Sequence, residues 1–261
     1  MNQEYESNYE KVFSYFQGEF LKLDQEAAAQ KLGLFCEEDA IMIPWFGNCW
    51  RIDRNTGIIT DENGNIPDVT QRLLIMHHFC FFRMDAVHSD KWVPFRQIRE
   101  AACFERAYKK SAVDPIVEYF TGKTELFAQA ARVLGGTPVP YGDAGFRIYP
   151  LPQIGLTYIF YDADEEFEAS CNILFESTVT WWIHPESVPT IASAATEKLI
   201  ATAERMDTAE QKATAERMDT AEQKATTEQT DGVGQKEATE QADAAGKKEK
   251  QSRRIHPIKM E

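Results

Sequence analysis

Near the start of the chain, aromatic and aliphatic residues recur with the period of an α-helix. On such a helix they lie within a stripe about 100° wide and are Tyr5, Tyr9, Val12, Phe13, Phe16 and Phe20. We therefore predict an amphipathic helix whose apolar stripe faces a core. A short second helix is predicted over residues 24–32, because Asp24 can serve as its N-cap and Gly33 as its stop.

The pattern then changes to the short apolar runs that are typical of strands. They are separated by the turn Asn55-Thr56-Gly57 and cover residues 40–46, 50–53 and 58–60. A longer helix is predicted over residues 69–86, with Asp68 as its N-cap. Because this segment is apolar on nearly all sides, we expect it to be central, with Phe82 in the core.

The second half of the domain mixes helical and strand signals. Helices are predicted over residues 97–108 and 124–134 and after Pro189, and the Pro- and Gly-rich residues 137–152 are predicted to be a loop. The clearest strand signal is a pair of alternating segments, residues 154–160 and 168–175. Since helices and strands do not alternate strictly, the prediction is an α+β fold, a single mixed domain of helices and antiparallel sheet.

Around residue 200 the composition changes to a non-globular C-terminal tail. The twelve residues 201–212, ATAERMDTAEQK, are repeated identically in 213–224, and two diverged copies follow. Twelve residues advance a helix face by about 120°, so no continuous apolar stripe forms. We expect a globular domain over residues 1–200 and a low-complexity tail over residues 201–261 that is disordered or transiently helical and dispensable for folding.

Charge restricts the choice of partner. Residues 1–196 carry 28 acidic and 16 basic side chains, so the domain is strongly acidic. A polyanion would be repelled, which disfavours nucleic acid as a partner. The chain starts without a signal peptide and holds no run of about 18 apolar residues, so we expect a cytoplasmic protein without a membrane partner.

The cysteines do not indicate a cofactor site. They are widely spaced, form no C-x-x-C pair, and are Cys36, Cys49, Cys80, Cys103 and Cys171. This pattern is not that of a disulfide framework, a zinc ribbon or an iron–sulfur site, so buried reduced thiols are expected. His77 and Cys80 would share a helix face at a spacing that suits metal ligands, but no further ligand is evident, and we predict no metal site.

The most unusual local feature is an acidic turn, defined here as residues 162–166. It carries four carboxylates, those of Asp162, Asp164, Glu165 and Glu166. They could bind a divalent cation, act as a paired acid and base, dock a basic partner, or only solvate a hairpin turn. The order of residues is not that of an EF-hand, and the motifs of phosphate-binding loops, dinucleotide-binding folds and common hydrolases are absent.

Several segments resemble a known family. They run from Leu151-Pro152 through Phe160, over Asp164-Glu165-Glu166-Phe167 and Asn172-Ile173-Leu174-Phe175-Glu176, with earlier support from Lys91-Trp92-Val93-Pro94-Phe95-Arg96. The pattern is similar to the uncharacterised prokaryotic domain-of-unknown-function family 3786, which is common among anaerobes. Gly155, Tyr161, Glu168 and Glu176 stand where that family often has other residues. The resemblance implies a setting in anaerobic metabolism that is linked to a cofactor or to redox chemistry, and it names no cofactor.

Two functional hypotheses follow. The first is a non-catalytic accessory or binding protein, with a protein or a cofactor-bearing molecule as its partner. The second is an enzyme in which the acidic turn supplies acid–base or divalent-cation chemistry and Arg96 clamps an anion. The two differ in geometry, because an enzyme requires Arg96 and the turn to line one pocket.

Overall fold

The computed structural model describes residues 8–209 and residue 212. The chain divides into two compact units, Met1–Arg205 and Met206–Glu261. Of the second unit, residues 206–209 and 212 are described, and they are helical. The first unit extends past the predicted boundary at residue 200, because Thr202 and Ala203 are buried in it. The repeats beyond residue 212 lie outside the described residues.

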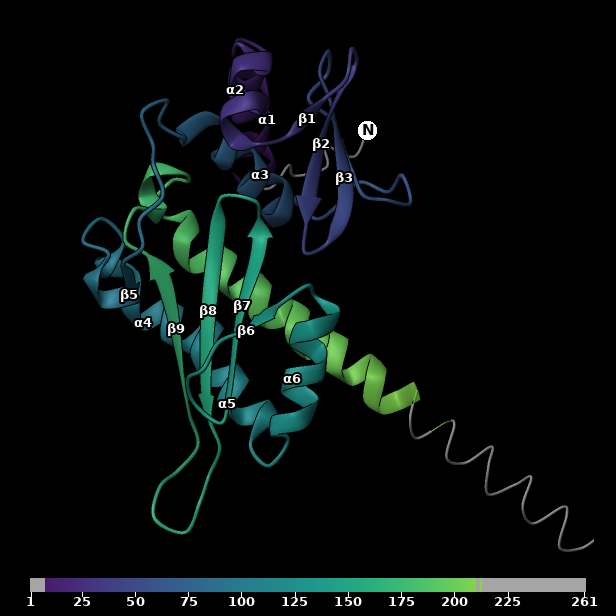
Figure 1. The fold of residues 1–261 in the computed structure, drawn as a ribbon. Helices are drawn as coiled ribbons and strands as arrows, with labels where there is room; N and C mark the ends of the chain where they lie inside the picture. Colours follow the sequence, from purple (N-terminus) through teal and green to yellow (C-terminus); the bar gives the residue numbers. More distant parts are fainter. Residues whose placement is uncertain (1–7, 210–211, 213–261) are drawn as a thin grey trace, which may run out of the picture. The chain divides into compact units, whose positions relative to one another are not determined.

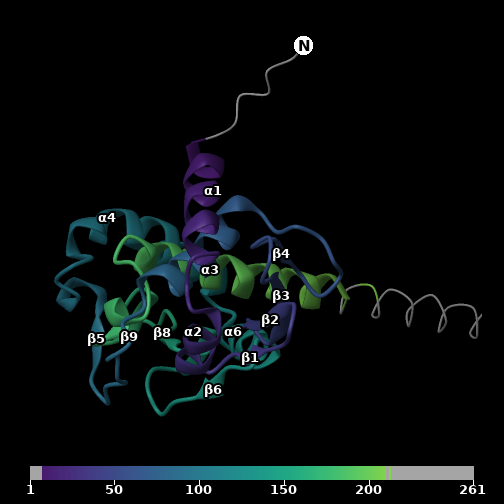
Figure 2. The same cartoon turned by 90° about the horizontal axis from the view of Figure 1, so that it is seen from above.

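The N-terminal part of the first unit combines helices with a small antiparallel sheet (Figures 1 and 2). The helices are α1 (Asn8–Phe20), α2 (Gln25–Leu32) and α3 (Val69–Phe81). The sheet has the order β1-β2-β3-β4, with β1 (Phe35–Cys36), β2 (Ala40–Trp45), β3 (Asn48–Asp53) and β4 (Ile59–Thr60). The predicted caps are confirmed, since the Asp24 carboxylate accepts from the Ala27 N–H and Gly33 adopts a left-handed conformation with φ of 66°.

Helix α3 is shorter than predicted. Asp68 caps it as expected, but it ends at Phe81, and Phe82 is extended, with ψ of 149°. The apolar run continues beyond the helix, so apolar content alone gave the wrong end. Phe82 is only half-buried, and its predicted place in the core is wrong, whereas Phe79 is 1% exposed and stacks edge-on against Phe20.

The unit also contains a five-stranded antiparallel sheet, in the order β5-β9-β8-β7-β6. Its strands are β5 (Trp92–Pro94), β6 (Thr137–Pro138), β7 (Ala144–Leu151), β8 (Ile154–Tyr161) and β9 (Ser170–Glu176). The predicted hairpin of β8 and β9 is confirmed. The predicted loop over residues 137–152 is wrong, because it contains β6 and β7.

Gly145 weakens the strand pattern of β7, and packing explains why a glycine is required there. A Cβ on Gly145 would lie 2.5 Å from the Tyr141 carbonyl oxygen, so the close approach of the two chain segments excludes any side chain there. Pairing with β8 from Ala144 to Ile148, and again at Leu151, then stabilises β7 in spite of its weak intrinsic pattern.

The predicted helix over residues 97–108 is also wrong. This stretch breaks into short pieces: 3-10 turns at Phe95–Gln97 and Ala102–Phe104, helix α4 (Glu105–Tyr108) and a π-helix at Lys109–Val113. Helices α5 (Asp114–Phe120) and α6 (Thr124–Val133) follow. A last helix of the unit runs over residues 187–205.

The helices of the second half cover one face of the five-stranded sheet (Figure 1). The fully buried Tyr158 hydroxyl on β8 lies 3.3 Å from the Ala192 carbonyl oxygen and from the Thr196 hydroxyl of the last helix. Phe127 of α6 packs against the same strand, 6.4 Å from Tyr158 between ring centroids. The fold is therefore α+β, as predicted.

Candidate functional site

The acidic turn lies in the connection between β8 and β9, at the end of the hairpin (Figure 1). Its first carboxylate, on Asp162, accepts hydrogen bonds from the Gly122 N–H at 2.8 Å and the Thr124 hydroxyl at 2.6 Å. These bonds, the one from Gly122 foremost, lower the pKa of Asp162. Asp162 therefore fastens the turn to the start of α6.

Of the other carboxylates of the turn, one forms hydrogen bonds within the turn and two are exposed to solvent. Asp164 accepts from the N–H groups of Glu166 and Phe167, both at 2.8 Å, and so closes the turn locally. The Glu165 and Glu166 side chains are exposed. Among the described residues, no group of three or more His, Cys, Asp or Glu side chains is arranged to hold a metal ion.

Arg96 lies elsewhere, in a groove beside β9. Called the β9 groove here, it has a volume of about 390 Å³ and is lined by Pro94, Phe95, Arg96, Glu105, Tyr108, Lys109, Val113, Cys171, Asn172, Ile173 and Leu174. None of the acidic-turn carboxylates lines it. Pro94 pairs with Leu174 near one end of β9, whereas the acidic turn precedes Ser170 at the other end. The structure thus separates Arg96 from the acidic turn.

Two aromatic side chains that line the β9 groove pack against each other. The rings of Phe95 and Tyr108 are stacked, with centroids 4.2 Å apart and planes at 10°, and both pack edge-on against Phe175. The Tyr108 hydroxyl donates to the Ile173 carbonyl oxygen across 3.4 Å. Burial raises the pKa of Tyr108 well above its usual value, so the hydroxyl stays protonated and available as a donor.

The rim of the β9 groove is cationic. Arg96 and Lys109 are exposed and line it, and Glu105 is the one acid among the lining residues. Lys109 begins the π-helix at Lys109–Val113, a conformation that is rare and often found at functional sites. Exposed Arg99, Arg106 and Lys110 lie in the same segment of the chain. The salt bridges found among the described residues involve none of these five cations.

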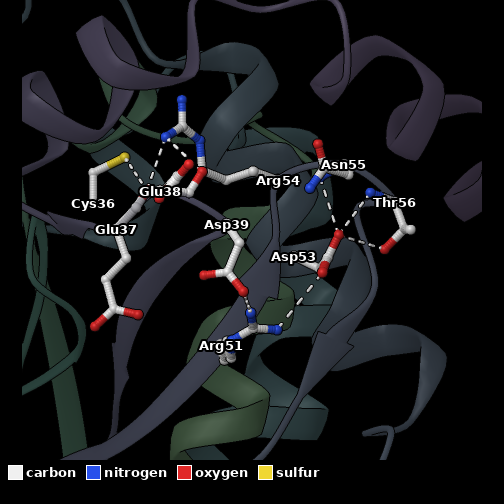
Figure 3. A network of polar contacts seen from close by, with 9 residues as sticks. All are labelled: Cys36, Glu37, Glu38, Asp39, Arg51, Asp53, Arg54, Asn55 and Thr56. Carbon is white, nitrogen blue, oxygen red and sulfur yellow. Dashed lines mark hydrogen bonds and ion pairs between the residues drawn. The ribbon is translucent and has the colours of Figure 1, made fainter.

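A second polar cluster lies on the small sheet (Figure 3). There Arg51 bonds the Asp39 carboxylate at 2.7 Å and lies 3.7 Å from that of Asp53. Asp53 also accepts from the Thr56 hydroxyl and from the N–H groups of Thr56 and Asn55, and these bonds, the one from the hydroxyl foremost, lower its pKa. These groups close turns and satisfy one another, so the cluster has a structural role.

Two neighbouring histidines of α3 are used in packing. His78 is fully buried, with its Nδ1 2.8 Å from the Trp182 carbonyl oxygen, and His77 Nδ1 lies 2.6 Å from the Ser187 hydroxyl. Burial lowers the pKa of each to about 4, so both are neutral. The pairing of serine and histidine resembles a nucleophile with its base, but Ser187 is 4% exposed and substrate has no access to it. Cys80 bonds the Phe16 carbonyl oxygen at 3.7 Å, not a metal ligand.

A third histidine, His88, links three segments of the chain through hydrogen bonds, an arrangement called the His88 latch here. His88 Nδ1 lies 2.8 Å from a Glu176 carboxylate oxygen, and its Nε2 lies 2.5 Å from the Gln153 side-chain oxygen. Gln153 donates its amide to the Leu32 carbonyl oxygen, which fixes that oxygen toward His88. Partial burial disfavours protonation, but the bonds to Glu176 and Gln153 outweigh it and raise the pKa of His88. The latch joins the end of β9 to α2 and to the β7–β8 turn.

The cysteines are less buried than predicted. All five are free thiols, yet Cys49 and Cys103 are exposed and only Cys171 is buried. Cys171 lines the β9 groove, where burial raises the pKa of its thiol to about 12 and keeps it protonated.

Comparison with known proteins places the chain in a family. Residues 24–198, well over half of the chain, match the family described as Domain of unknown function (DUF3786). The chain belongs to this family. The resemblance read from the sequence is thereby confirmed, and the DUF3786 segment includes the β9 groove, the acidic turn and the His88 latch. No curated protein and no solved structure matches the chain. No described helix is both long and apolar enough to cross a membrane.

Sequence reasoning found Arg96 but missed the rest of the β9 groove. Tyr108, Lys109 and Asn172 come from a short helix, a π-helix and a strand that only the fold brings together. One signal was available, since residues 91–110 hold six of the 16 basic residues of the acidic domain. This local excess of basic residues begins beside β5, an edge strand of the sheet, and continues into the residues that line the groove.

Proposed function

We propose that this protein is a non-catalytic binding protein that holds an anionic group of its partner in the β9 groove. The observation that carries the proposal is the groove itself, with Arg96 and Lys109 exposed at its rim. Among residues 8–209 and 212, no salt bridge engages either cation, and such cations attract an anion and form charge-assisted hydrogen bonds with it.

The negative charge of the rest of the domain limits which anions the groove can bind. Residues 1–196 carry 12 more acids than bases. A cationic rim on such a surface admits a compact anion, whereas an extended polyanion such as a nucleic acid would meet repulsion on either side. A small anion, or a short acidic segment of a larger molecule, therefore fits the protein best.

The alternative is an enzyme that uses the carboxylates of the acidic turn, with Arg96 as an anion clamp. That mechanism needs Arg96 and an acid in one cavity. Arg96 lines the β9 groove without any turn carboxylate, and Asp162 and Asp164 are engaged by backbone N–H groups. We therefore favour binding over catalysis. A cytoplasmic location and an accessory role beside a cofactor-bearing partner in anaerobic metabolism complete the proposal.

The test uses anions of increasing size on the full chain. Inorganic phosphate, citrate and capped hexaglutamate are titrated into isotope-labelled protein, and amide chemical shifts are recorded. We expect shifts confined to the β9 groove, which the double variant Arg96→Gln/Lys109→Gln abolishes. The matched control, Lys11→Gln/Lys22→Gln, removes two exposed cations outside the groove and should bind as wild type does. Failure of every probe to shift groove amides would refute the proposal.

A further inference from the structure

The five-stranded sheet has an outer face, opposite the helices, that adjoins the β9 groove. On β9, Ile173 is buried and pairs with Tyr158, which contacts the last helix. Its neighbours Asn172 and Leu174 are exposed and half-buried, respectively. Because successive side chains of a strand point to opposite faces, Asn172 and Leu174 lie on the outer face. Both also line the β9 groove, so the groove and the outer face share these residues.

An arginine is held on the outer face next to the groove. Thr157 pairs with Leu174, and Arg147 of β7 pairs with Thr157. The Arg147 backbone therefore lies two strands, or about 10 Å, from Leu174. The Arg147 Nε–H donates to the Thr157 hydroxyl across 3.1 Å, and its guanidinium lies 3.9 Å from the centroid of the Trp92 ring. Arg147 is thus half-buried and held by a hydrogen bond and an aromatic ring.

A close approach at Gly155 determines where the Trp92 ring lies. A Cβ on Gly155 would be 2.8 Å from the Cη2 atom of Trp92 and 2.9 Å from the Tyr149 ring, so both rings rest directly on the β8 backbone. The Trp92 ring therefore contacts both this backbone and Arg147. Since Trp92, Pro94 and Leu174 are all half-buried, an apolar surface extends from the groove to the arginine.

Arg147 keeps hydrogen-bonding capacity for a ligand. Within residues 8–209 and 212, no salt bridge engages Arg147, and its hydrogen bond to Thr157 uses only Nε. The two Nη groups can therefore bind a carboxylate through parallel hydrogen bonds. Arg96 and Lys109 at the groove rim likewise lack a salt-bridge partner there, so cations without acids stand at both ends of the apolar surface.

From this geometry we infer that the β9 groove and Arg147 together bind an elongated dianion, a small molecule in which an apolar spacer joins two carboxylates. One carboxylate meets Arg96 and Lys109 at the rim, and the other meets Arg147. The spacer crosses the half-buried Pro94 and Leu174 between them. The inference rests on the proposed function and specifies the partner as a small molecule.

Two anchoring points favour a dianion over a single anion. A free anion gains little from one cation at a surface. Once the first carboxylate is held at the rim, the second meets Arg147 intramolecularly, at an effective concentration that is roughly millimolar. The spacer must also be long enough to reach Arg147, so the site selects ligands by length as well as by charge.

Monocarboxylates and dicarboxylates of equal chain length test the inference. Octanoate and suberate differ only in the second carboxylate, and decanoate and sebacate form a longer pair. Each is titrated into the isotope-labelled full chain while amide and arginine Nε–H signals are recorded. We expect at least one dicarboxylate to bind tenfold or more tightly than its monocarboxylate and to shift the Arg147 Nε–H signal. Succinate is too short for the span and should leave that signal unchanged.

The variant Arg147→Gln isolates the second anchor. It should reduce the affinity of the dicarboxylate to that of the matching monocarboxylate and leave the binding of inorganic phosphate at the rim unchanged. The matched control is Arg132→Gln, since Arg132 also lies over an aromatic ring, 5.3 Å from Phe146, but belongs to α6. This control should bind every probe as wild type does. Should Arg147→Gln fail to fold, the Arg147 Nε–H signal of wild type still gives the answer.

Two results would overturn the inference. The first is equal affinity of each dicarboxylate and its monocarboxylate, with no shift of the Arg147 Nε–H signal. The second is a preference for the dicarboxylate that Arg147→Gln retains. In either case the proposed function stands if phosphate or citrate still shifts the groove amides. If no anion shifts them, both proposals fail.

Discussion

Replacing Phe79 by Ala should destabilise the domain far more than the same change at Phe82. Phe79 is 1% exposed on α3 and packs edge-on against the fully buried Phe20, with ring centroids 5.1 Å apart. Removing such a ring loses its transfer free energy and leaves a cavity, which costs about 3–5 kcal/mol in other proteins. Phe82 follows the end of α3 and is half-buried, so water can fill the space and the loss should stay below about 2 kcal/mol.

Urea denaturation followed by tryptophan fluorescence measures both losses. With a slope of about 3 kcal/mol per molar urea, Phe79→Ala should lower the midpoint by about 1–1.7 M. An unchanged slope would show that the two variants unfold from comparably compact states. Equal midpoint shifts in the two variants, or a larger shift for Phe82→Ala, would refute the placement of the core.

The remaining predictions concern the acidic turn and the His88 latch. Glu165→Gln/Glu166→Gln should melt as wild type does, and added Ca²⁺, Mg²⁺ or Mn²⁺ should raise the melting temperature of neither protein; a rise in wild type alone would show a cation site. Asp162→Ala should lose about 1–2 kcal/mol in urea denaturation, since its hydrogen bonds to the start of α6 are lost, and an unaltered midpoint would contradict that role. The pKa of His88 is raised in the folded state, so its contribution to folding stability is complete below its unfolded pKa of about 6.5 and is lost as pH rises through the higher folded pKa. His88→Gln should therefore remove a fall in stability between neutral and alkaline pH. If the stability–pH profiles of wild type and this variant run parallel, the latch is not the source of that fall.

The elements that the sequence predicted well carry their own local signals. Asp24 and Gly33 delimit α2, and Asp68 caps α3, because side-chain capping and left-handed glycine depend on neighbouring residues alone. The hairpin of β8 and β9 was predictable because both strands alternate about one polar turn. The fold class followed from these segments.

The failures have tertiary causes. Strand β7 contains Gly145 and Pro150, which weaken its intrinsic pattern, and it forms because β8 supplies a partner along most of its length. The β9 groove depends on where a neighbouring strand stops, which no periodicity in β9 itself records. Within the acidic turn, the sequence showed four equivalent carboxylates, whereas only the fold distinguishes the anchoring Asp162 from the exposed Glu165.

The end of β5 connects the core to the β9 groove. At Pro94 the chain leaves the sheet, and Phe95 turns inward to stack on Tyr108 and to pack against Phe175. These aromatic contacts stabilise the core, and they also keep the chain from continuing as a strand beside Ile173. The wall of the β9 groove is therefore built from side chains that also belong to the packed core. Arg96 follows Phe95 directly in the chain, so the turn that packs the core also sets Arg96 at the rim of the β9 groove.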